Sequence, residues 1–145
     1  MLFVVTGPPA AGKSSWIQAH ATARDIVIDL DRITVALTGP GAPHWNHDPV
    51  HVRVAQKARY AAIHEAYKHL DKLDVYLIHT LPDSKALAQY KRLDAEIIAV
   101  DPGRDVVMQR IEAMRSSEMR AVATKWYRQR ARLPQPAMPQ ASRDW

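Results

Sequence analysis

The stretch MLFVVTGPPAAGKSSWI, residues 1–17, decides the fold. It begins with a short apolar run, Leu2 to Val5, which predicts a buried strand. A tight turn follows, and a helix is expected to open at Ser14. The turn satisfies the pattern G-x-x-x-x-G-K-[ST] with Gly7, Gly12, Lys13 and Ser14.

This pattern predicts a phosphate-binding loop. Glycines allow the backbone to curl round an anion with its N–H groups inward, and the following helix adds its positive N-terminal end. Lys13 would reach the β- and γ-phosphates, and the Ser14 hydroxyl would bind Mg²⁺. A chance glycine-rich turn is the alternative, but the strand before and the helix after favour a nucleotide site. The predicted nucleotide-binding residues are Gly7, Pro8, Pro9, Ala10, Ala11, Gly12, Lys13, Ser14 and Ser15.

Size and composition indicate one small globular domain. The chain has 145 residues, of which 47% are hydrophobic and 24% charged, and no apolar run approaches the length of a membrane span. We expect a cytoplasmic protein without a membrane partner, since the first apolar stretch is too short for a signal peptide. The absence of cysteine excludes disulfides and a thiol nucleophile.

The positive charge is concentrated near the C-terminus. Residues 1–102 hold eleven basic and eleven acidic side chains, whereas residues 103–145 hold nine and four, and eight of those nine are arginines. Arginine suits phosphate because of its planar fork of donors. An anionic partner such as a nucleotide or nucleic acid is therefore favoured over a merely solvated basic helix.

Four apolar runs alternate with helical patterns. The runs predict strands over residues 2–5, 26–30, 74–80 and 96–100. The patterns predict helices over residues 14–24, 50–70, 81–93, 104–114 and 118–132, with a helical turn over 33–37. This alternation predicts an α/β fold with a mainly parallel sheet, the first strand central. Residues 1–132 would form this domain, with an arginine-rich lid and a C-terminal helix, and the proline-rich tail 133–145 would be disordered or docked only in an oligomer.

Two aspartates follow the second predicted strand. Asp31 comes just past its end and should point into the crevice where α/β sheets bind ligands, so it is the leading catalytic candidate. A helix N-cap is the alternative role for Asp31. Asp29, earlier in the strand, could hold Mg²⁺ through water, brace Ser14, or be a satisfied buried carboxylate.

Three further groups of residues have both a functional and a structural interpretation. His44, His47 and His51 are close enough for a metal site but lack a convincing ligand set. Trp45 could stack on an acceptor base or pack under its loop. The last helix interleaves basic residues with Trp126 and Tyr127. This pattern fits contact with nucleic acid or adenine, and it fits equally well a helix that packs its aromatic residues on the sheet. The basic residues are Arg120, Lys125, Arg128, Arg130 and Arg132.

The long helix over 50–70 carries two predicted faces. Its apolar set includes Val54, Ala58, Ala61, Ala62 and Ala66. A basic and aromatic stripe recurs at three- and four-residue steps, at Arg53, Lys57, Tyr60, His64 and Lys68.

With Gly7 to Ser14, Trp16, and Asp31 after the second strand, the chain resembles the P-loop kinases related to the kinase domain of phage polynucleotide kinase, among the small zeta-toxin-like P-loop kinases. The resemblance covers most of residues 1–130, and it implies a three-layer sandwich with helices on both faces of the sheet and the strand order 2-3-1-4. It implies that Asp31 accepts the proton of an acceptor hydroxyl, and that Arg115 or Arg110 is a lid arginine bridging the β- and γ-phosphates.

The chain departs from this family at two places. His79-Thr80 ends the third strand where an aspartate is frequent, so outer-shell Mg²⁺ binding would rely on Asp29 or Asp31. Thr34 replaces an arginine that holds the acceptor phosphate, a task that Arg32 or the stripe could assume. The predicted acceptor-binding residues are Asp29, Arg32, Thr34, Trp45, Arg53 and Lys57.

The sequence thus predicts an ATP- and Mg²⁺-dependent phosphotransferase. The acceptor would be a hydroxyl of a nucleotide or nucleic acid, such as a DNA or RNA 5′ end or a hydroxymethylated base. Two alternatives remain. One is a kinase of a nucleoside, a nucleoside monophosphate or an antibiotic. The other is an ATP-binding ATPase or assembly protein that forms homo-oligomers through its C-terminal helix and tail.

Overall fold

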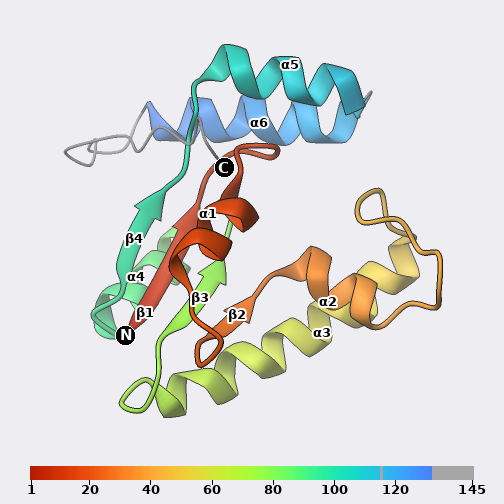
Figure 1. The fold of residues 1–145 in the computed structure, drawn as a ribbon. Coiled ribbons are helices and arrows are strands. Elements are labelled where there is room, and N and C mark those ends of the chain that lie inside the picture. The colour runs from red at the N-terminus through yellow and green to blue at the C-terminus, as the bar shows by residue number, and fades with distance from the viewer. Residues whose placement is uncertain (115, 132–145) are drawn as a thin grey trace.

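A four-stranded, all-parallel sheet forms the centre of the computed structural model, which describes residues 1–114 and 116–131 (Figure 1). The strand order is β2-β3-β1-β4, as predicted. The strands are β1 (Leu2–Thr6), β2 (Ile26–Ile28), β3 (Val75–Ile78) and β4 (Glu96–Ala99). Since β1 is central, the loop that follows it opens at the carboxyl edge of the sheet, where α/β folds bind ligands.

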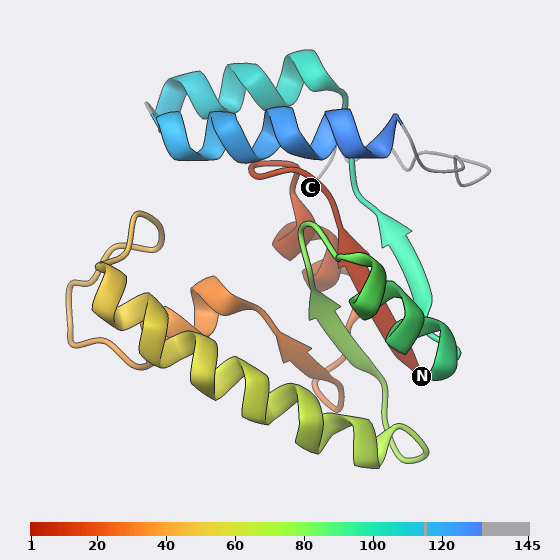
Figure 2. The same cartoon turned by 180° about the vertical axis from the view of Figure 1, so that it is seen from behind.

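The described residues form six α-helices and one 3₁₀ turn. They are α1 (Lys13–His20), α2 (Leu30–Ala36), α3 (Pro49–Ala66), η1 (Tyr67–His69), α4 (Ser84–Arg92), α5 (Arg104–Met114) and α6 (Ser117–Arg130). Of these, α5 and α6 follow the last strand. The views from the front and from behind place α1 and α4 on opposite faces of the sheet, and α5 beside α6 across one end (Figures 1 and 2). The predicted α/β architecture is confirmed.

The alternation of side chains along β1 explains the two faces. Val5 belongs to a core cluster with Trp16 of α1, Ile111 of α5 and Ala123 of α6. Val4, its neighbour, belongs to a second cluster with residues of α3 and α4. Successive strand residues point to opposite faces, so a fully apolar strand needs helices on both.

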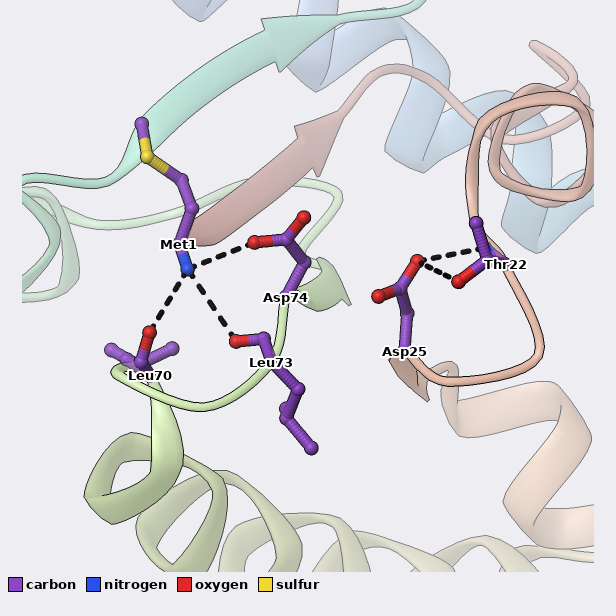
Figure 3. A network of polar contacts seen from close by, with 6 residues as sticks. All are labelled: Met1, Thr22, Asp25, Leu70, Leu73 and Asp74. Atoms are coloured by element: carbon purple, nitrogen blue, oxygen red, sulfur yellow. Dashed lines mark hydrogen bonds and ion pairs between the residues drawn. The ribbon is translucent and has the colours of Figure 1, made fainter.

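Helix α1 ends earlier than predicted, at His20 instead of about residue 24. Ala21 has an extended backbone, and the carboxylate of Asp25 accepts hydrogen bonds from the N–H and hydroxyl groups of Thr22 (Figure 3). This local turn satisfies groups that another helical turn would have used.

The start of β1 is fixed to the segment that precedes β3. The Met1 ammonium group donates to the carbonyl oxygens of Leu70 and Leu73 and lies 3.0 Å from Oδ1 of Asp74 (Figure 3). These contacts set the register in which Leu2 pairs with Val75.

Helix α3 turns only part of its predicted apolar face inward, since Ala66 is buried and Ala62 packs against the core, as predicted. Val54 is 53% exposed and Ala61 is also exposed, whereas Ala55 and Ala66 are buried. Helix α3 packs against α2 and β2, and this packing selects the inward side. The predicted basic and aromatic stripe on the other side is exposed. Among the described residues, no helix is both long and apolar enough to cross a membrane.

Candidate active site at the carboxyl edge of the sheet

A cleft of about 540 Å³ opens at the carboxyl edge of the sheet. Its walls come from the loop after β1, the start of α2, the end of β3 and one side of α6. The volume lies in the range of small-molecule sites. Because it also lies at the edge of the sheet where α/β folds bind ligands, we take it as the candidate functional site.

The loop between β1 and α1 depends on its glycines. Gly7 has φ 149° and Gly12 has φ 94°, values that side-chain-bearing residues rarely adopt. A Cβ atom at Gly7 would lie 2.2 Å from the carbonyl oxygen of Val100, which excludes any side chain there. The loop can follow this path only with glycine at its first position.

Lys13 folds back over this loop. Its Nζ donates to the carbonyl oxygens of Gly7 at 2.9 Å and Pro8 at 2.7 Å. Loss of water lowers the pKa of the Lys13 ammonium to about 8, although Asp29 and Asp31 act in the opposite direction. An ammonium has three donors, so one remains for an anion in the cleft that Lys13 lines.

Asp29 links the first turn of α1 to the start of α2. Its Oδ2 accepts the hydroxyl of Ser14 at 2.9 Å, and its Oδ1 accepts the backbone N–H of Asp31 at 3.1 Å. Strand β2 ends at Ile28, and Asp29 is the N-cap of α2, so the cap role that the sequence left open for Asp31 belongs to Asp29. Bracing of Ser14 is one of the roles considered for Asp29.

Asp31 lies in the first turn of α2 and lines the cleft with its side chain 67% exposed. Partial burial raises the pKa of its carboxyl group, and the neighbouring Asp29 raises it further, while His47 and Lys13 lower it. His47 lies 3.2 Å away, from its Nε2 to Oδ1 of Asp31. The sequence suggested His47 only as part of a metal site. Within the described residues, no group of three or more His, Cys, Asp or Glu side chains could hold a metal ion.

The sequence interpretation missed Arg59, which comes from α3 and lines the same cleft. Its Nη2 donates to the carbonyl oxygen of Ile78, at the end of β3, over 3.1 Å. Arg59 stands in the buried stripe of α3, four residues after Ala55 and seven before Ala66. A charged residue on the inward side of an amphipathic helix is the signal that could have identified it.

His79 and Thr80 line the cleft beyond the end of β3. The pKa of His79 is lowered by burial and by the positive charge of Arg59, whereas burial raises the pKa of Tyr90 to about 12. The Tyr90 hydroxyl therefore keeps its proton, and it is hydrogen-bonded to Nδ1 of His79 at 2.6 Å. The end of β3 therefore adds no carboxylate to those of Asp29 and Asp31, which also line the cleft.

Several predicted site residues do not line this cleft. Thr34 is fully buried, and its hydroxyl donates to the carbonyl oxygen of Leu30, so its prediction as an acceptor contact is wrong. Arg110 donates to the carbonyl oxygen of Ala10 at 2.9 Å and so holds the loop. The exposed residues outside the cleft lining are Arg32, Trp45, Arg53 and Lys57. Arg115 and residues 132–145, including Arg132 and the predicted tail, lie outside the described residues.

The aromatic pair of α6 packs inward. Trp126 is buried, with the Arg130 guanidinium 5.0 Å from its ring centre. The Tyr127 hydroxyl donates to Oδ1 of Asp101 at 2.7 Å, and burial together with this carboxylate raises the pKa of Tyr127. These contacts fit the packing alternative for the last helix. Its exposed basic residues are Arg120, Lys125 and Arg128.

Comparison of the sequence with protein-family models and with curated proteins gave no match. The evidence for function therefore lies in the cleft and in the residues that line it.

Proposed function

We propose that this protein is an ATP- and Mg²⁺-dependent phosphotransferase that moves the γ-phosphate of ATP to a hydroxyl group of a nucleotide or nucleic acid. One observation carries the proposal. Lys13, Ser14 and Asp31 line a single cleft, and the buried carboxylate of Asp29 is hydrogen-bonded both to Ser14 and to the backbone of Asp31.

The donor phosphates would bind at the loop and the start of α1. The left-handed glycines curve the backbone there, and helix α1 begins at Lys13, so its N-terminal N–H groups add partial positive charge. Lys13 contributes a partly desolvated ammonium group. An anion beside it would compensate the cost of burying this charge, which makes the triphosphate its natural partner.

Ser14 and Asp29 fit the requirements of Mg²⁺. The ion prefers oxygen ligands and keeps several waters, and the hydroxyl of Ser14 and a carboxylate oxygen of Asp29 lie 2.9 Å apart. When bound, Mg²⁺ would neutralise charge on the transferring phosphoryl group.

Asp31 and Arg59 would act on the acceptor side. The exposed carboxylate of Asp31 takes the proton of the acceptor hydroxyl while that oxygen bonds to the γ-phosphorus. The bond from phosphorus to the β,γ-bridging oxygen breaks, and ADP leaves with its electron pair. Arg59 supplies a permanent positive charge in the same cleft, where negative charge spreads over the transferring oxygens.

Helix α6 would limit the access of water. Met119 and Val122, both apolar, line the cleft beside the loop. Exclusion of water favours transfer to an acceptor over hydrolysis, which distinguishes the proposed kinase from an ATPase.

A kinase of small molecules is the second candidate. It is favoured by the position of Trp45, Arg53 and Lys57. These residues lie outside the cleft lining, so the cleft itself offers few groups for a long polynucleotide.

The direct test uses γ-labelled ATP with four acceptors: 5′-hydroxyl DNA, 5′-hydroxyl RNA, hydroxymethylated DNA and free nucleosides. We expect label transfer to one class and its loss in Asp31→Asn with ATP affinity retained. Asp94→Asn is the matched control, because Asp94 is exposed and has a left-handed backbone that asparagine adopts readily. Transfer by Asp31→Asn at the wild-type rate would overturn the mechanism.

A further inference from the structure

The connection between α2 and α3 returns to the cleft at one side chain. Nε2 of His47, near the end of this connection, lies 3.2 Å from Oδ1 of Asp31, sixteen residues earlier in the chain. Asn46 has a left-handed backbone with φ 58°, and Asp48 caps α3 by accepting the N–H of Val50 at 2.8 Å. The backbone of His47 thus lies between a bend and a helix start, and its imidazole is placed by the contact with Asp31.

The two members of this pair differ sharply in exposure. The His47 side chain is 6% exposed, whereas that of Asp31 is 67% exposed. A substrate in the cleft can therefore contact the carboxylate, and the imidazole lies behind it. This difference assigns the proton acceptor to Asp31 and excludes a direct role of His47 on the substrate.

An isolated aspartate would be poorly oriented at this position. Its carboxylate is near that of Asp29, and like charges repel each other. The side chain of Asp31 projects from the first turn of a seven-residue helix into solvent. A hydrogen bond from a buried donor limits its rotation, and only a correctly oriented base is within reach of the hydroxyl proton.

We propose that His47 is a positioning residue, which donates its Nε2–H to Oδ1 of Asp31 and leaves Oδ2 directed at the acceptor hydroxyl. The proposal rests on the proposed function and deepens it, because it assigns the connection between α2 and α3 to the acceptor side of the cleft. An ionised carboxylate only accepts hydrogen bonds, so the proton belongs to Nε2 of His47.

Three variants test the role in catalysis: His47→Ala, His47→Gln and the control His44→Ala, which changes an exposed histidine of the same connection. The probes are γ-labelled ATP and a 5′-hydroxyl oligodeoxynucleotide, with deoxynucleosides as a second acceptor. We expect kcat of His47→Ala to fall about tenfold with KM for ATP unchanged. Glutamine places an N–H donor at a similar distance from the backbone, so His47→Gln should recover to within about threefold of wild type.

A second measurement needs no turnover. The ¹⁵N spectrum of the His47 imidazole should report the Nε2–H tautomer in the wild type, with a shift that changes in Asp31→Asn. The Nδ1–H tautomer, or a shift insensitive to Asp31→Asn, would overturn the proposal even if no acceptor is phosphorylated.

The outcomes separate the two hypotheses. If Asp31→Asn loses transfer while His47→Ala keeps the wild-type kcat, only the role of His47 is refuted, and the proposed function stands. Undiminished transfer in Asp31→Asn would refute the assignment of Asp31 as the base, and absence of label transfer by the wild type to every acceptor would refute the proposed function. In the Asp31→Asn background, His47→Ala should have no further effect on residual transfer, since the two groups act as one unit.

Discussion

The hydroxyl oxygen of Ser14 lies 2.9 Å from Oδ2 of Asp29, and this contact joins the first turn of α1 to the N-cap of α2. The other oxygen of the same carboxylate accepts the backbone N–H of Asp31. Asp29 is only 5% exposed. One buried carboxylate therefore fixes the distance between the proposed donor side and the proposed acceptor side of the cleft.

Removal of this carboxylate should affect both stability and metal dependence. Asp29→Ala removes a helix cap and a buried acceptor, which should lower the free energy of unfolding by about 2 kcal/mol. Asp29→Asn keeps an acceptor for the N–H of Asp31 and should cost less than about 1 kcal/mol. Urea denaturation checks the stabilities. Calorimetric titration of Asp29→Asn should show weaker binding of Mg²⁺-ATP and unchanged binding of Mg²⁺-free ATP; equal losses would contradict the assigned metal role.

Gly7 should tolerate no substitution. Gly7→Ala combines a backbone at φ 149° with a Cβ 2.2 Å from the carbonyl oxygen of Val100, so the loop or the end of β4 must move. We expect a loss of about 3 kcal/mol in unfolding free energy and of ATP binding. Gly39→Ala is the matched control, because a Cβ there meets nothing within 4 Å. Equal stability of the two variants would show that the tight approach is absent in solution.

The sequence predicted the sheet well because its signals are local. Each strand is a short apolar run between helical patterns, and right-handed crossovers leave few strand orders once β1 must be central. It was harder to predict which face of α3 is buried. Both sides of this helix carry alanines and valines. Ala66 was predicted to be buried, but only contact with α2 and β2 selects Ala55 over Val54 and Ala61.

The part of the candidate site that lies close together in the sequence could be predicted. The loop, Ser14 and the two aspartates were identified because their spacing carries the chemistry. Arg59 and His47 come from α3 and from the connection before it, and they enter the cleft through tertiary packing that no local pattern encodes. The prediction for Thr34 depended on the resemblance alone, and Thr34 lies on the buried side of α2.

Arg59, and not residue 34, should contribute charge to the proposed reaction. Arg59→Ala should lower kcat/KM for phosphoryl transfer about a hundredfold, since a permanent cation beside the transferring group stabilises spreading charge. Arg59→Lys should recover part of this loss, and Arg53→Ala, on the exposed side of the same helix, should behave as wild type. Steady-state kinetics checks all three. Equal activity of Arg59→Ala and Arg53→Ala would contradict the role of Arg59.

Lys13 should make stability depend on pH in the alkaline range. Burial lowers its pKa from 10.5 to about 8, so between these values the unfolded chain binds a proton that the folded chain has lost. The free energy of unfolding should then rise with pH, by about 2 kcal/mol from about pH 8 to about pH 10. Lys13→Met lacks this group, so the wild type should gain stability relative to the variant over that range, while the variant fails to bind ATP at any pH. Urea denaturation of both proteins across the range measures the difference. Parallel pH profiles would mean that the ammonium is fully hydrated in solution, and that the cleft does not desolvate the residue on which phosphate binding depends.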